Sequence, residues 1–98
     1  TVKVFPEFFE KAEIEEIDTI IQHLKSEFVD LMKHEYGNYM MQKLFSVCNL
    51  ERRVQILEVL TPQLSEIVMS KQGTHAFQEF ISFFTTDQEY SLVLNKIR

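Results

Sequence analysis

The feature that most constrains this chain is an internal repeat with a period of 36 residues. Gly37 and Gly73 lie 36 positions apart, and each is followed five residues later by a glutamine, Gln42 and Gln78. The apolar positions around them correspond at the same spacing: Phe28 with Leu64, Leu31 with Ile67, Met32 with Val68, Leu44 with Phe80, and Phe45 with Ile81. Units that repeat at such a period stack on their neighbours and bury a continuous core, so the chain is expected to form a solenoid.

Turn residues and apolar spacing divide each repeat into three helices. In the second repeat we expect helices from Thr61 (as N-cap) to Ser70, from about Thr74 to Phe84, and from Thr86 onward, with Gly73 ending the first of them in backbone angles that a Cβ would penalise. The first repeat shows the same plan over about 27–34, 38–47 and 50–60. With only two Gly and two Pro, a β-sandwich is excluded.

The fold class predicted from this plan is all-α, an α-solenoid of three-helix repeats. Residues 1–25 are expected to form an N-terminal flanking helix, over about 7–25, and the tail of a preceding repeat. Residues 26–61 and 62–98 are expected to form the two repeats.

Charge and motif content exclude several classes of function. The net charge of −5 lies entirely in residues 1–35, with nine acids and four lysines, whereas residues 36–98 hold six acids and six bases. This distribution does not favour sequence-blind binding to phosphates, so any nucleic acid would be bound mainly through its bases. No apolar run approaches the roughly 20 residues of a membrane span, which predicts a soluble, intracellular protein with no membrane partner.

The chain lacks the residue patterns of an enzyme or a metal site. His34-Glu35 is not continued as an HExxH pair, the two glycines form no phosphate-binding loop, and Cys48 falls on an apolar stripe, where a buried structural thiol is expected. We therefore predict no catalytic residue, no metal and no cofactor.

The second helix of each repeat carries a polar face opposite its apolar stripe. Asn38 and Gln42 stand four residues apart with Tyr39 beside them, a pattern that returns 36 residues later at Thr74, His75 and Gln78. An exposed amide pair beside a flat ring suits single-stranded RNA, whose bases are read by edge contacts and by stacking. The alternative is that these residues only form a solvated polar helix face. The repetition of the pattern after 36 residues favours RNA binding over that alternative.

The segment Gly37–Phe45 (GNYMMQKLF) resembles the core motif of a Pumilio (PUF) repeat, and Gly73–Gln78 resembles a second one. The resemblance covers about residues 14–98 and implies an armadillo-type superhelix whose concave surface binds single-stranded RNA. It implies base-edge contacts from Asn38 and Gln42 to uracil with Tyr39 stacking, and from Thr74 and Gln78 to adenine with His75 stacking. Because RNA runs antiparallel to the protein in that family, the implied step is 5′-A-U-3′ or 5′-N-U-3′, where N is any base. Auxiliary RNA contacts are implied for Lys43, Arg52 and Arg53.

The function implied is sequence-selective RNA binding of the mRNA 3′ untranslated region type, hence regulation of mRNA stability or translation. The resemblance also implies protein effectors of mRNA decay or translation. It implies a cytoplasmic location, and the family has nuclear and nucleolar members as well. A helical-repeat scaffold of the HEAT or armadillo kind, binding protein and not RNA, is the alternative. The neutral-to-acidic charge favours that alternative, and the repeated amide pair favours RNA.

Overall fold

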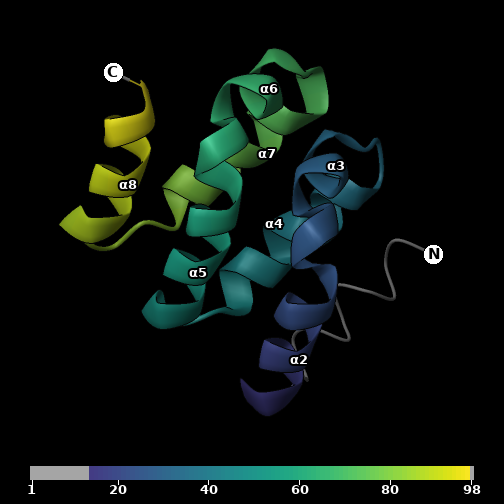
Figure 1. Ribbon diagram of the computed structural model, residues 1–98, viewed down its shortest axis with the longest axis vertical. Coiled ribbons are helices and arrows are strands. Elements are labelled where there is room, and N and C mark those ends of the chain that lie inside the picture. Colours follow the sequence, from purple (N-terminus) through teal and green to yellow (C-terminus); the bar gives the residue numbers. More distant parts are fainter. Residues whose placement is uncertain (1–13, 98) are drawn as a thin grey trace.

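The computed structural model describes residues 14–97, in which every regular element is a helix (Figure 1). In chain order the elements are α2 (Ile14–Leu24), the 3-10 turn η1 (Lys25–Glu27), α3 (Phe28–Lys33), α4 (Gly37–Val47), α5 (Leu50–Leu60), the 3-10 turn η2 (Thr61–Gln63), α6 (Leu64–Met69), α7 (Lys71–Ser82) and α8 (Asp87–Ile97). We call α3–α5 unit 1 and α6–α8 unit 2. The predicted helix over residues 7–13 lies outside the described residues. The all-α solenoid predicted from the repeat is confirmed.

The helix ends follow from capping groups that the sequence contains. Asn49 Oδ1 accepts a hydrogen bond from Arg52 N at 3.1 Å, so α5 begins where the pattern predicts. The last residue of α5, Leu60, also agrees with the predicted range. At the start of α8, Thr86 Oγ1 accepts from Glu89 N at 3.4 Å while Glu89 Oε1 accepts from Thr86 N at 3.2 Å. This is a capping box, as expected. Thr61 makes no side-chain cap, because α5 runs directly into η2 there and the chain does not leave the helical path.

Gly73 lies inside α7, and the expectation that it ends a helix with unusual backbone angles is wrong. Neither glycine has a positive φ. Glycine is required there for a different reason, since a Cβ at position 73 would lie 2.1 Å from Ile67 O. At Gly37 a Cβ would meet the Leu31 side chain at 2.9 Å. Both glycines therefore allow the first and second helices of a unit to approach closely.

The two units share one apolar core. Phe45 of α4 stacks on Phe80 of α7 with ring centroids 4.1 Å apart and planes 11° apart, and both rings are fully buried. The apolar stripe along each second helix is buried, with Met41, Leu44, Phe45 and Cys48 in unit 1 and Phe77, Phe80 and Phe84 in unit 2. Ile81 is the exception, being 36% exposed. Figure 1 shows the units following one another from α2 toward α8, as in a solenoid.

Candidate RNA-binding surface

The predicted stacking residues Tyr39 and His75 line the same open, polar cavity between the units. Tyr39 stands on α4 and is 50% exposed, and His75 stands on α7 and is also exposed. With Glu35, Asn38, Lys71 and Gln72 they surround a space of about 260 Å³. Two flat rings at one cavity, with amide and charged groups around them, present the kinds of contact that a nucleobase uses.

Asn38 lines this cavity although it is almost fully buried, and its amide is already hydrogen-bonded. The side chain is 2% exposed, so the expectation that it is exposed is wrong. Its Nδ2 donates to His34 O at 2.8 Å and to Glu35 O at 2.9 Å. Because carbonyl oxygens only accept, these two bonds use both Nδ2 hydrogens and fix which way the amide points. Asn38 thereby ties the end of α3 to the start of α4.

Gln42 takes its orientation from Asn38. Its Nε2 donates to Asn38 Oδ1 at 3.0 Å, and the side chain is half-buried. Since that oxygen only accepts, Gln42 must present its own NH₂ to it. Gln42 Oε1 and the second Nε2 hydrogen are left for other partners. The two amides thus form a chain of fixed polarity that starts at the carbonyls of residues 34 and 35.

His34 fixes the same turn from the other side. Its Nδ1 accepts hydrogen bonds from Tyr36 N and Gly37 N, both at 3.0 Å. These are orphan donors at the start of α4, so His34 caps the following helix. In unit 2 the corresponding donor, Gly73 N, bonds to Ser70 Oγ at 2.8 Å. The spacing of three residues from His34 to Gly37 and from Ser70 to Gly73 is the signal that would have revealed this.

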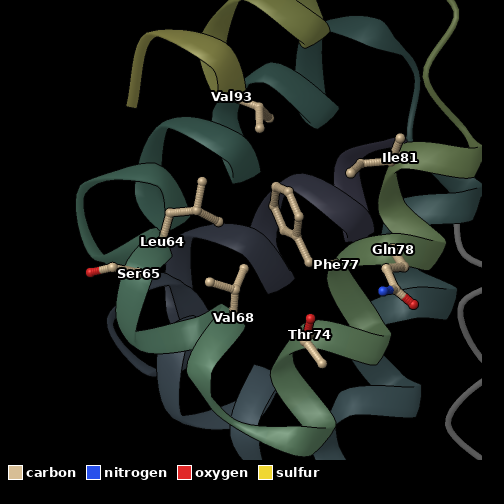
Figure 2. A pocket seen from close by; sticks show the side chains of 8 residues that line it. All are labelled: Leu64, Ser65, Val68, Thr74, Phe77, Gln78, Ile81 and Val93. Atoms are coloured by element: carbon tan, nitrogen blue, oxygen red, sulfur yellow. The ribbon is translucent and has the colours of Figure 1, made fainter. Parts of the chain in front are cut away.

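Thr74 and Gln78 lie at a second cavity, which is apolar and separate from the cavity that Tyr39 and His75 line. Thr74 is half-buried and Gln78 is exposed. Both line the rim of an opening between α6, α7 and α8 (Figure 2). Within residues 14–97 no hydrogen bond orients the Gln78 amide, because Thr74 offers no equivalent of Asn38 Oδ1. Of the six predicted base-contacting residues, three line the first cavity, two line the second, and Gln42 lines neither and is bonded to Asn38.

Arg52 and Arg53 join elements to one another and do not present free guanidinium groups. Arg52 binds Asp18 of α2 through Nε–Oδ1 and Nη2–Oδ2 contacts of 2.7 Å each. This hydrogen bonding raises the pKa of Arg52 above its ordinary value. Arg53 Nη1 donates to Phe83 O at 2.7 Å, and its guanidinium lies 5.4 Å from the centre of the Phe45 ring. The auxiliary RNA contact expected of these two side chains stays a prediction, and it would be made by guanidinium groups that are already bonded within the fold.

Lys43 and Cys48 complete the set of residues singled out by sequence. The Lys43 carbonyl accepts from Ser46 Oγ at 2.7 Å within α4. Cys48 is 5% exposed, and burial raises the pKa of its thiol to about 12. Burial and raised pKa are typical of a structural thiol and not of a nucleophile.

Residues 14–97 hold no group of three or more His, Cys, Asp or Glu side chains placed to bind a metal ion. In that same part of the chain, no helix is long and apolar enough to cross a membrane.

The fold and this surface define a helical-repeat protein whose second helices carry a repeated polar face. The family model described as the Pumilio-family RNA binding repeat matches residues 27–61. Pumilio homolog 11 of Arabidopsis thaliana is 32% identical over 93% of the chain, and Pumilio homolog 9 of the same plant is 30% identical over 98%. The chain spans 17% and 18% of those two proteins, respectively.

A solved structure gives the same answer for the fold. The structure described as the Puf4 RNA binding domain bound to the HO endonuclease RNA 3′ UTR recognition sequence superposes with a TM-score of 0.87 and 27% identity. The match covers 98% of this chain and 30% of that one. The chain is built of Pumilio-type repeats.

Proposed function

We propose that this chain binds single-stranded RNA, with α4 and α7 forming the surface that contacts the bases. The observation that carries the proposal is the placement of Tyr39 and His75 at one polar cavity between consecutive units. Each ring offers a stacking face, and a stacked base contributes on the order of 1–3 kcal/mol. The Pumilio-type repeats, and the RNA in the Puf4 complex, support the same function.

At unit 1 the base selected is uracil, and Gln42 is the residue that reads it. Gln42 Oε1 accepts from the N3–H of uracil, and the free Nε2 hydrogen donates to a neighbouring carbonyl of the base. Cytosine carries an acceptor at N3, which would face Oε1 without a hydrogen. Asn38 acts as a positioning residue, because its Oδ1 holds the Gln42 amide in this orientation at 3.0 Å.

At unit 2 the resemblance supports adenine for Thr74 and Gln78, which gives the step 5′-A-U-3′. The Gln78 amide has no partner within residues 14–97 that fixes its orientation, so its selectivity is expected to be weaker than that of Gln42. A wrong base at a well-formed edge contact costs about 1–3 kcal/mol.

In the cell this binding serves control of mRNA stability or translation through 3′ untranslated regions, in the cytoplasm and with protein effectors. The family resemblance and the 3′ UTR sequence bound by Puf4 support that role. The function proposed is binding, with no reaction catalysed.

Fluorescence anisotropy with labelled octamers tests the proposal. We expect an RNA with A-U steps to bind more tightly than an all-C octamer, and Gln42→Ala to remove the difference. Gln63→Ala, an exposed glutamine in η2, is the matched control and should preserve it. Equal binding of the two RNAs by the unaltered chain would contradict base reading and favour the protein-scaffold alternative.

A further inference from the structure

The cavity that Tyr39 and His75 line is built from equivalent positions of the two units, and one of these positions carries opposite charges. Tyr39 and His75 are 36 residues apart in sequence, and so are Glu35 and Lys71. Both members of each pair line the cavity of about 260 Å³. The unit 1 side of the cavity therefore carries a carboxylate, and the unit 2 side carries an ammonium group.

Lys71 has no protein partner within residues 14–97. Its side chain is exposed, and no hydrogen bond or ion pair joins its Nζ to another described residue. Other cations in that part of the chain are paired: Lys33 Nζ lies 2.6 Å from Glu66 Oε1, and Arg52 Nε lies 2.7 Å from Asp18 Oδ1. The Lys71 ammonium is thus available to an anion from outside the chain.

The helix that carries Lys71 adds to the positive potential at this point. Lys71 is the first residue of α7, and the first turn of α7 holds no acidic residue. A helix N-terminus carries a partial positive charge, so a cation is placed unfavourably there unless an anion lies nearby. In unit 1 the equivalent position is occupied by an acid, Glu35. An anion bound at Lys71 would offset the unfavourable placement of its charge.

We propose that Lys71 binds the phosphodiester that links the two bases contacted by α4 and α7. The proposal rests on the proposed function and adds a backbone contact to it. When consecutive bases stack on Tyr39 and His75, the phosphate between them passes the cavity that these rings line. Among the described residues that line this cavity, Lys71 is the one with a permanent positive charge. Glu35 repels the same phosphate, so the linkage lies toward α7.

The salt dependence of RNA binding tests this contact. Each phosphate of a single strand that a cation neutralises contributes about 0.7 to the slope of log affinity against log salt concentration. We expect Lys71→Gln to reduce the magnitude of that slope by about 0.7, so its loss of affinity for the A-U octamer should be about 2.6-fold larger at 50 mM than at 200 mM salt. The preference over the all-C octamer should persist, because Gln42 is unchanged, and the melting temperature should not fall.

Lys25→Gln is the matched control for the loss of one charge. Lys25 is also exposed and also lines a cavity, but that cavity shares no lining residue with the one around Tyr39 and His75. Its removal should leave the salt slope unchanged. Glu35→Gln should act in the opposite direction to Lys71→Gln and strengthen binding, more at 50 mM than at 200 mM salt, because it removes the repulsion.

An octamer with an uncharged methylphosphonate between the A and the U locates the contact. Lys71→Gln and the unaltered chain should bind this RNA equally, whereas a methylphosphonate at the 5′-terminal linkage should preserve the difference between them. Equal salt slopes for Lys71→Gln and the unaltered chain would overturn the proposal and leave base reading intact. So would an effect of Lys71→Gln that persists with the neutral A-U linkage. Equal binding of the A-U and all-C octamers by the unaltered chain would contradict base reading, and the slope would still decide the contact of Lys71. Absence of RNA binding would overturn both proposals.

Discussion

Gln42 Nε2 and Asn38 Oδ1 lie 3.0 Å apart, and this single hydrogen bond connects the backbone of the α3–α4 turn to the surface proposed to bind RNA. The polarity of the connection is set by the carbonyls of His34 and Glu35, which accept both Nδ2 hydrogens of Asn38. A rigid turn thus determines which atoms of Gln42 a base can meet. Local stability and base selectivity are therefore coupled at this position.

Asn38→Ala is expected to reduce both properties at once. It leaves two backbone carbonyls without their side-chain donor, which costs about 1–3 kcal/mol of folding free energy. It also frees Gln42 to turn its amide, so the preference for uracil over cytosine should fall while overall affinity changes less. Urea unfolding and anisotropy titrations measure the two effects. A variant that keeps full uracil preference would show that Asn38 does not orient Gln42.

The two glycines should differ in their tolerance of a methyl group. Gly73→Ala places a Cβ 2.1 Å from a backbone oxygen, Ile67 O, which cannot move without displacing α6. A cost of about 3 kcal/mol or more is expected. Gly37→Ala meets the Leu31 side chain, which can rotate, at 2.9 Å and the Leu31 backbone oxygen at the milder distance of 3.1 Å, so about 1–2 kcal/mol is expected. Chemical unfolding compares them, and equal losses would contradict the close approach at Gly73.

Much of the fold follows from the sequence, because the period, the apolar stripes and the caps all agree. The bounds of α5 and the capping box at Thr86 are examples in which a local signal determines the structure. Gly73 shows the limit: its role depends on how closely α6 approaches α7, and no local rule reveals that distance.

The site was less predictable than the fold. The spacing of Asn38 and Gln42 indicates a shared face, but the burial of Asn38 depends on the carbonyls of the preceding turn. The pairing of the two arginines was hidden for a related reason, since Asp18 and Phe83, their partners, lie more than 25 residues away in sequence. Their auxiliary RNA contact stays a prediction. The bases contacted and the repeat boundaries stay predictions.

Arg53 and Glu89 are expected to be strongly coupled. Glu89 is fully buried, its Oε2 has no hydrogen-bond partner among residues 14–97, and Arg53 Nη1 lies 4.0 Å from it. Arg53→Ala removes the nearby charge and the bond to Phe83 O, so a loss of about 3–5 kcal/mol is expected. Glu89→Gln keeps an oxygen for the donors of Thr85 and Thr86, so adding it to Arg53→Ala should restore part of the loss. Additive effects in this double-mutant cycle would contradict the coupling.

The Cys48 thiol provides a probe of unfolding. Its folded pKa of about 12 lies above the ordinary value of 9.0, so the neutral thiol is favoured in the folded chain. The contribution to stability is fully present below pH 9 and should fall between about pH 9 and pH 12, as the unfolded thiol ionises first. Thiol labelling at pH 8 should be slow and should accelerate with added urea. Immediate labelling of the folded chain would show that Cys48 is accessible.

Residue-resolved NMR tests the central claim most directly, because it detects weak binding and locates it. Labelled chain is titrated with a short single-stranded RNA containing A-U steps, and separately with an all-C RNA of the same length. We expect the largest shifts at Tyr39, His75 and the side-chain amide of Gln42, with the all-C RNA failing to move the Gln42 signal. Signals at these residues that stay unchanged at high RNA concentration, or that respond equally to both RNAs, would contradict base reading by α4 and α7.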